Sequence, residues 1–386
     1  MQSISESLTL HEKWKGKIEV ISRVQLDNSE IMSQAYTPGV AEPCIAISED
    51  NNLSYKYTRK HNLVAVITDG TAVLGLGDIG PLASMPVMEG KCALFKEFAD
   101  IDAFPICIDA KDPDEIILTI KNISKSFGAI NLEDISSPRC FYIEQELRKQ
   151  CDIPVFHDDQ HGTAVVLLAG LMNALRLKKM DISEAKIVIN GAGAAGTAIC
   201  DLLIKAGAED LIVCDIEGIL DEEMKNLSEH KKRLSLLTNR KHLRGLLKDA
   251  IIKRDVFIGV SKPNLLTMDD VANMNKNPVI FAMANPVPEI NPIDAKKAGA
   301  FIVGTGRSDF DNQINNVMAF PGIFKGLLSI RAKEISDEML ISAAKAISAL
   351  VTDEQLNKNY ILPKAFDKRL VEAVANAVII QASSKQ

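Results

Sequence analysis

The sequence lacks the features that tie a protein to a membrane, to nucleic acid or to a disulfide-stabilised fold. No apolar stretch approaches the about 20 residues that a membrane-spanning helix needs, and the N-terminus has no apolar signal segment. The formal net charge of −7 and the pI near 5.5 argue against nucleic acid or an anionic membrane as a partner. The seven cysteines form no C-x-x-C pair and are odd in number, which favours reduced thiols. We therefore expect a cytoplasmic protein without disulfides.

A length of 386 residues, of which 47% are hydrophobic and 25% charged, suffices for two or three folded domains. The first 30 or so residues read as helical. Residues 62–70 and 71–80 resemble the two strands of a β-hairpin, with Gly and Asp at the turns. A helix is expected after them, from Pro86 to Phe98.

From residue 103 the pattern changes to alternating strands and helices. Apolar strands are predicted at residues 103–110, 128–134 and 153–159. A helix that begins with Asp112 and Pro113 separates the first two strands. A second helix separates the others, with Ser137 as its N-cap and Pro138 as its first residue. Such alternation is typical of parallel strands joined by right-handed crossovers.

A glycine-rich turn predicts a dinucleotide-binding domain. Gly191, Gly193 and Gly196 form the pattern G-x-G-x-x-G between a predicted strand, 186–190, and a predicted helix. These glycines allow a tight turn and a close approach of the backbone to a pyrophosphate at the helix N-terminus. Asp215 ends the next strand, where a carboxylate can accept a hydrogen bond from a ribose 2′-hydroxyl. Asp215 and the neighbouring Glu217 should repel a 2′-phosphate, which favours NAD over NADP.

The predicted fold class is therefore α/β, with a doubly wound, Rossmann-type NAD-binding domain and an N-terminal α/β domain. The doubly wound pattern covers roughly residues 165 to 310. The chain after about Asn312 reads as helices, which we expect to pack back on the N-terminal region. We place the domain boundary near residue 160, giving a substrate and metal domain at 1–160 and a dinucleotide domain with the C-terminal helices at 161–386.

Four carboxylates follow two of the predicted parallel strands. Glu133 and Asp134 end the strand 128–134, and Asp158 and Asp159 end the strand 153–159. Ligands of open parallel sheets bind beyond the carboxyl ends of the strands, so these side chains are expected to converge there. Clustered carboxylate oxygens suit Mg²⁺ or Mn²⁺. As an alternative, single acids of this group could merely cap helices.

His157 and His161 flank the second acid pair and raise the alternative of a zinc site. A strand end and a turn are expected between them, which argues against a shared helical face, and no cysteine pair is nearby.

Two further residues have two interpretations each. Lys91 lies in an apolar helix and is either a surface side chain, which its composition favours, or a buried amine acting as a base. Tyr36 stands beside a Pro-Gly turn and, taken alone, is structural.

Eight motifs follow one another between Tyr36 and Gly326 and read YTPGV, TDGTAVLGLGDIG, EGKCALFKEFADID, NLEDI, FHDDQHGTA, INGAGAAG, AMANP and NNVMAFPG. In this order they resemble the malic enzyme family, in the form of its short microbial subunit. The resemblance implies oxidative decarboxylation of L-malate to pyruvate and CO₂ with NAD(P)⁺ and Mg²⁺ or Mn²⁺. It also implies a homodimer.

The resemblance assigns roles to residues that match the family's motifs. It implies that Lys91 takes the proton of the C2 hydroxyl and that Tyr36 protonates C3. It further implies that Glu133, Asp134 and Asp159 bind the metal and that Asp158 is a supporting acid beside the lysine. The residues implied to contact the cofactor are Gly191, Gly193, Ala194, Ala195, Gly196, Asp215 and Asn285. Those implied to contact the substrate are Lys91, Asn285 and Asn316. On this basis Asp159 should be stabilised by a cation and Asp158 by Lys91, with the histidines as scaffold.

One stretch departs from the family pattern. Larger members carry an arginine shortly after TDG that binds a substrate carboxylate, and this sequence has Thr71, Ala72 and Val73 there. Carboxylate recognition must therefore come from elsewhere in the chain or from a partner chain. Three alternative functions stay open: a malolactic enzyme that retains NAD and releases lactate, a 2-hydroxy acid dehydrogenase that forms oxaloacetate, and a non-catalytic dinucleotide sensor.

Overall fold

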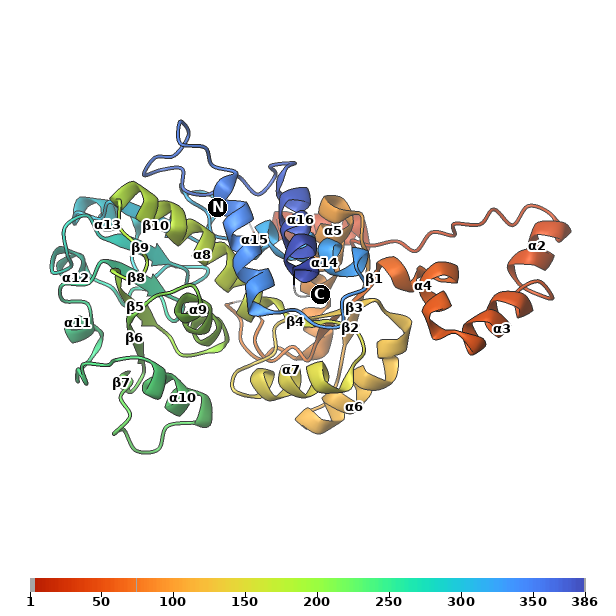
Figure 1. The fold of residues 1–386 in the computed structure, drawn as a ribbon, viewed down its shortest axis with the longest axis horizontal. Coiled ribbons are helices and arrows are strands. Elements are labelled where there is room, and N and C mark those ends of the chain that lie inside the picture. Colours follow the sequence, from red (N-terminus) through yellow and green to blue (C-terminus); the bar gives the residue numbers. More distant parts are fainter. Residues whose placement is uncertain (1–3, 74, 385–386) are drawn as a thin grey trace.

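The computed structural model describes residues 4–73 and 75–384, without the side chains of residues 4 and 5. It contains two sheets, which lie on either side of the long helix α8 (Asp158–Lys178) (Figure 1). Within the described residues, no helix is both long and apolar enough to cross a lipid bilayer.

The first sheet is wholly parallel, with the strand order β2-β1-β3-β4. Its strands are β1 (Leu63–Thr68), β2 (Asp102–Cys107), β3 (Ala129–Leu132) and β4 (Val155–His157). The helices of this part are α1 (Ile4–Trp14), α2 (Ser29–Ala35), α3 (Ala41–Glu49), α4 (Ser54–Tyr57), α5 (Gly80–Ala99), α6 (Pro113–Ile123) and α7 (Arg139–Gln150), with the 3-10 helices η1 (Asn51–Leu53), η2 (Arg59–Asn62) and η3 (Ser124–Ser126). Helices α2 and α3 extend away from the body of the molecule (Figure 1).

The second sheet has the order β10-β9-β8-β5-β6-β7 and is parallel except for its edge strand β7. Its strands are β5 (Lys186–Asn190), β6 (Asp210–Asp215), β7 (Gly218–Ile219), β8 (Val256–Gly259), β9 (Val279–Ala282) and β10 (Ile302–Thr305). The remaining helices are α8 (Asp158–Lys178), α9 (Ala194–Lys205), α10 (Glu229–Leu237), α11 (Leu247–Ala250), α12 (Met268–Ala272), α13 (Pro292–Lys297), η4 (Asn316–Met318), α14 (Phe320–Ser329), α15 (Asp337–Ala349) and α16 (Leu370–Ser383). Because the order reverses between β5 and β8, the doubly wound prediction is confirmed.

The C-terminal helices return to the N-terminal part of the chain, as expected. The Phe95 ring on α5 meets Phe320 and Phe324 of α14 edge-on, with ring centroids 4.8 and 5.0 Å apart. All three rings are fully buried, and such aromatic pairs add stability beyond the area they bury. This packing fixes α5, the helix that carries Lys91.

Four local predictions are wrong. The first 30 or so residues are not helical throughout, because α1 ends at Trp14 and α2 begins only at Ser29. Residues 71–80 do not form a hairpin strand, because β1 pairs with β2 on one side and β3 on the other and has no free edge; Leu74 of this segment lies outside the described residues. Helix α5 begins at Gly80, six residues before the predicted start. Helix α7 has Pro138 as its N-cap, without a side-chain cap from Ser137. By contrast, α6 begins as predicted, with the Asp112 side chain accepting from the Asp114 N–H.

Candidate active site

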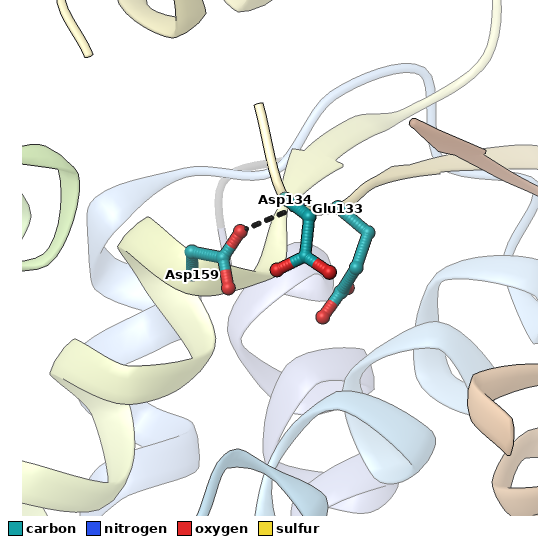
Figure 2. Close-up of side chains that lie close together, drawn as sticks. All are labelled: Glu133, Asp134 and Asp159. Carbon is teal, nitrogen blue, oxygen red and sulfur yellow. Dashed lines mark hydrogen bonds between the residues drawn. The ribbon is translucent and has the colours of Figure 1, made fainter. Parts of the chain in front are cut away.

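Three carboxylates converge at the carboxyl edge of the first sheet. Glu133 and Asp134 follow β3, and Asp159 stands in the first turn of α8 (Figure 2). One ligand atom from each of the three lies within 4.8 Å of the others. Asp159 Oδ2 accepts a hydrogen bond from the Asp134 backbone N–H at 2.8 Å. Asp134 takes up a left-handed backbone conformation, φ 54°, which aspartate tolerates better than most residues.

This cluster contains more negative charge than its neighbours neutralise. Burial raises the pKa of Glu133, Asp134 and Asp159, and the mutual repulsion of the carboxylates raises it further. Within the described residues, Asp134 Oδ2 is buried and has no hydrogen-bond partner. A divalent cation would remove both penalties, and hard carboxylate oxygens are the ligands that Mg²⁺ and Mn²⁺ prefer. The predicted metal ligands therefore fit such a cation.

Lys91 reaches the same cluster from α5 and is buried, with 7% of its side chain exposed. Its Nζ lies 2.5 Å from Asp158 Oδ2 and 2.9 Å from Glu133 Oε1, above the face of the Phe320 ring. Burial opposes the positive charge, but the two carboxylates outweigh it and raise the pKa of Lys91. The structure places Lys91 against Asp158 and buries it, so the surface interpretation of Lys91 is wrong.

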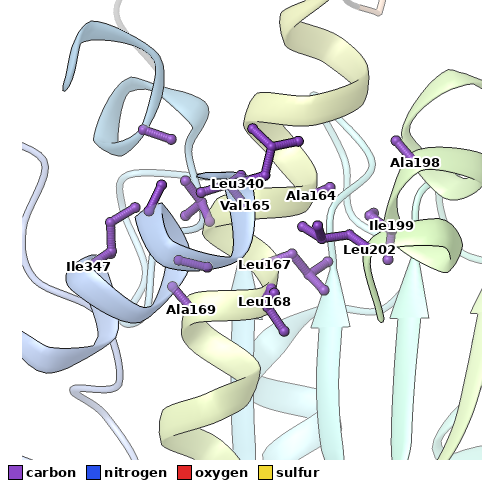
Figure 3. Packing of buried hydrophobic residues seen from close by; sticks show 14 of the residues in the cluster. Ala164, Val165, Leu167, Leu168, Ala169, Ala198, Ile199, Leu202, Leu340 and Ile347 are labelled. Atoms are coloured by element: carbon purple, nitrogen blue, oxygen red, sulfur yellow. The ribbon is translucent and has the colours of Figure 1, made fainter. Parts of the chain in front are cut away.

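The close packing of α8 fixes the position of the acids in its first turn. Strand β4 runs into α8 without the expected turn, so Asp158 is already helical and fully buried. Val165, Leu167 and Leu168 are wholly buried beside α9 and α15 (Figure 3). A Cβ at position 162 would lie 1.8 Å from Asp158 Oδ1, so glycine at this position leaves the room that the Asp158 carboxylate needs. This role of Gly162 is not predicted from the sequence.

His161 points to Glu144, whereas His157 lies between Gln160 and the acid cluster, with its Nε2 3.4 Å from Asp159 Oδ2. His161 Nε2 lies 2.9 Å from Glu144 Oε1, and His157 Nδ1 lies 2.9 Å from Gln160 Nε2. Burial lowers the pKa of His157 to about 4, so this ring is neutral at physiological pH. Burial also disfavours charge on Glu144, but His161 and Arg148 outweigh it and lower the pKa of this acid to about 2. The zinc alternative receives no support from this geometry, because the ligand atoms that converge among the described residues come from the three acids and from neither histidine.

One cavity of about 970 Å³ joins this cluster to the predicted dinucleotide site. It is lined by Lys91 and the three acids, by Ala194 and Ala195 of the glycine-rich turn, and by Asn285 and Asn316. Asn316 donates from Nδ2 to Asp158 Oδ2 at 2.7 Å, which links η4 to the lysine–acid pair.

The glycine-rich turn has the geometry that a dinucleotide requires. Gly191 has φ +118°, and a Cβ there would lie 2.7 Å from the Val260 carbonyl oxygen. A Cβ at Gly196 would lie 1.7 Å from the Gly191 carbonyl oxygen, so both positions require glycine. Gly193 is the N-cap of α9 and has open space around its missing Cβ, where a pyrophosphate can approach.

The end of β6 differs from the expectation of purely acidic surroundings. Lys231 of α10 places its Nζ 2.7 Å from Asp215 Oδ2 and 2.8 Å from Glu217 Oε1. The two carboxylates expected to repel a 2′-phosphate are thus already paired with a cation. Lys231 is not predicted from the sequence, because it comes from the following helix and not from the stretch beside Asp215.

Tyr36 is not brought to this cavity within one chain. It follows α2 on the arm that extends from the body, and 72% of its surface is exposed. Helices α2 and α3 contain no buried residue, and the arm also exposes Val20, Ile21 and Ile45. The arm therefore presents apolar surface that is not covered within the chain.

Comparisons with known proteins agree with this geometry. Residues 15–148 match the family described as malic enzyme, N-terminal domain, and residues 160–383 match malic enzyme, NAD binding domain. The chain is 54% identical to a bifunctional malic/malolactic enzyme of Bacillus subtilis, over 97% of this chain and 91% of the relative. It is 52% identical to an NAD-dependent malic enzyme of Geobacillus stearothermophilus, over 94% of this chain and 76% of the relative. The crystal structure of an NAD-dependent malic enzyme from Thermotoga maritima superimposes with a TM-score of 0.94 at 47% identity, covering 97% of this chain and 98% of that one.

Proposed function

The chain belongs to the malic enzyme family, and we propose that it catalyses the oxidative decarboxylation of L-malate to pyruvate and CO₂, with NAD as hydride acceptor and a divalent cation as cofactor. A single observation carries this proposal. One cavity brings together a buried lysine, a cluster of three acids and the glycine-rich turn of a dinucleotide domain. Residues 1–160 would serve substrate and metal, and residues 161–386 the dinucleotide, in a cytoplasmic enzyme.

Glu133, Asp134 and Asp159 would hold Mg²⁺ or Mn²⁺. Support comes from the spacing of their ligand atoms and from the buried, unpartnered Asp134 Oδ2 within the described residues. When bound, such a cation acts as a Lewis acid toward the oxygens of the substrate and eases the loss of CO₂. The neutral amides of Asn285 and Asn316 line the same cavity and can orient the substrate and the nicotinamide end.

Lys91 would accept the proton of the C2 hydroxyl. The nicotinamide, when bound, would supply the acceptor for the hydride from C2. The ammonium must first lose a proton, and both of its carboxylate partners oppose this loss. In this proposal Glu133 also binds the metal. When the cation is bound, Asp158 would therefore be the carboxylate that holds Lys91 in place. After CO₂ leaves, C3 needs a proton, which the phenol of Tyr36 supplies.

Tyr36 can take this role only from another copy of the chain if it stays on the extended arm. We propose a homodimer in which the arm of one protomer carries Tyr36 into the active site of its partner. The exposed apolar side chains of the arm support this arrangement, since isologous dimers bury such surfaces.

Mixing two inactive variants tests this arrangement directly. Tyr36→Phe and Lys91→Ala should each be inactive alone. Unfolded and refolded together, they should regain about a quarter of the wild-type turnover, because half of the dimers would then contain one site with both residues. If Tyr36 acted within its own chain, the mixture would stay as inactive as its components.

A malolactic activity is a second candidate, favoured by the bifunctional relative from Bacillus subtilis. The two reactions differ in whether reduced cofactor leaves the enzyme. An assay of NADH, pyruvate and lactate after addition of L-malate, run with each cofactor and with Mg²⁺ or Mn²⁺, separates them. We expect NADH and pyruvate in equal amounts; lactate without NADH would favour the alternative, and oxaloacetate without CO₂ would contradict both.

A further inference from the structure

Among the residues that the structure describes, no arginine lines the cavity to pair with a malate carboxylate. Ala72 lines the cavity where larger family members carry that arginine. Arg139 of α7 does not line the cavity, and its guanidinium pairs with the buried carboxylate of Asp69. Malate carries two carboxylates, so a further positive charge is required in a site that already contains several acids.

Of the described residues that line the cavity, three have side chains that can be cationic: His11, Lys17 and Lys91. The charge of Lys91 is taken up by two carboxylates, and His11 Nδ1 lies 2.8 Å from the Ser7 carbonyl oxygen. Lys17 has no ion pair of this kind within the described residues. Its Nζ donates to the Pro86 carbonyl oxygen at 2.7 Å, and an ammonium has two further protons to donate.

The segment that carries Lys17 is fixed against α5. The Lys17 backbone N–H donates to Glu89 Oε2 at 3.1 Å, and the preceding Gly16 has φ +108°. The ammonium lies over the turn of α5 just before Lys91, 3.9 Å from where a Cβ of Gly90 would be. Burial lowers the pKa of Lys17 while Glu89 opposes this, so the ammonium is partly desolvated without a full counter-charge.

We propose that Lys17 is a substrate-binding residue that pairs with the malate carboxylate retained in pyruvate, in place of the family's arginine. This inference rests on the proposed function and deepens it. We assign the retained carboxylate to Lys17 because this group stays an anion from substrate to product. A cation paired with the other carboxylate would oppose its departure as neutral CO₂, so the neutral amides of Asn285 and Asn316 suit that group better.

The test is a kinetic comparison of Lys17→Gln with the wild type, using NAD and excess Mn²⁺. The KM for L-malate should rise by about 10- to 100-fold with kcat little changed, because a charge-assisted hydrogen bond made equally in ground and transition states is lost. The inhibition constant of oxalate, which has no counterpart of the leaving carboxylate, should rise by a similar factor. Lys17→Arg should restore most of both losses.

Lys13→Gln is the matched control, because Lys13 is exposed on α1 and does not line the cavity. It should leave both constants unchanged. The thermal midpoint and the dissociation constant of NAD, measured for each variant, show that the fold is intact. An unchanged KM in folded Lys17→Gln would overturn the assignment, as would a raised KM with unchanged oxalate inhibition. Failure of the wild type to oxidise malate would instead overturn the proposed function.

Discussion

Replacing Lys91 with alanine should abolish malate oxidation and destabilise the protein, while NAD binding survives. The ammonium pairs with Asp158 and Glu133, which are 0% and 6% exposed in their side chains. Removing one partner of a buried pair costs about 3 to 5 kcal/mol, because the remaining charge is left uncompensated. Loss of a general base lowers kcat by about 10² to 10⁴-fold.

Lys96 of the same helix provides the control. It pairs with Asp100 and Asp102, but 56% of its side chain is exposed. Exposed pairs contribute about 0 to 1 kcal/mol, so Lys96→Ala should leave turnover unchanged and stability nearly so.

Both variants are compared by urea unfolding with EDTA present, by NADH formation from malate, and by titration with NAD. Two results would refute the reasoning for Lys91→Ala. Turnover within about tenfold of the wild type would exclude Lys91 as the base. A loss of unfolding free energy no larger than that of Lys96→Ala would exclude the buried ion pair as a stabilising contact.

Two further predictions concern the cofactor and acid stability. Asp215→Ser removes the ribose acceptor and frees Lys231 for a 2′-phosphate, so the ratio of kcat/KM for NADP to that for NAD should rise by at least about tenfold; an unchanged ratio would exclude the ribose contact. The pKa of Glu144 is lowered from 4.5 to about 2, so its stabilising contribution is fully present above about pH 5 and is lost as the pH falls toward 2. The free energy of unfolding of the wild type, measured in urea, should exceed that of Glu144→Gln by about 1.4 kcal/mol less at about pH 3.5 than at about pH 6. A difference that does not change with pH would contradict the ion pairs of Glu144 with His161 and Arg148.

Local patterns predicted the parts of the fold that depend on neighbouring residues. The glycine-rich turn, the strand before it and the helix after it lie within 20 residues, and each requires particular side chains that the sequence displays. The N-cap Asp112 is equally local, and its prediction is confirmed. The convergence of the three acids could be anticipated because parallel strands end at the same edge of a sheet.

Predictions that depended on distant partners were less successful. The hairpin at residues 62–80 was wrong because both edges of β1 are occupied by strands that come later in the chain. Composition favoured an exposed Lys91, since its partners Asp158 and Glu133 come from other strands and helices. Lys231 was missed for the same reason.

We expect Glu133, Asp134 and Asp159 to hold one divalent cation beside Lys91. Crystals of the protein soaked with Mn²⁺ and measured at the manganese absorption edge test it most directly. One strong anomalous peak should lie within about 2.0 to 2.4 Å of an oxygen from each of the three acids, and Asp159→Ala should show no such peak. A peak on His157 or His161, or no peak at the three acids of the wild type, would contradict it.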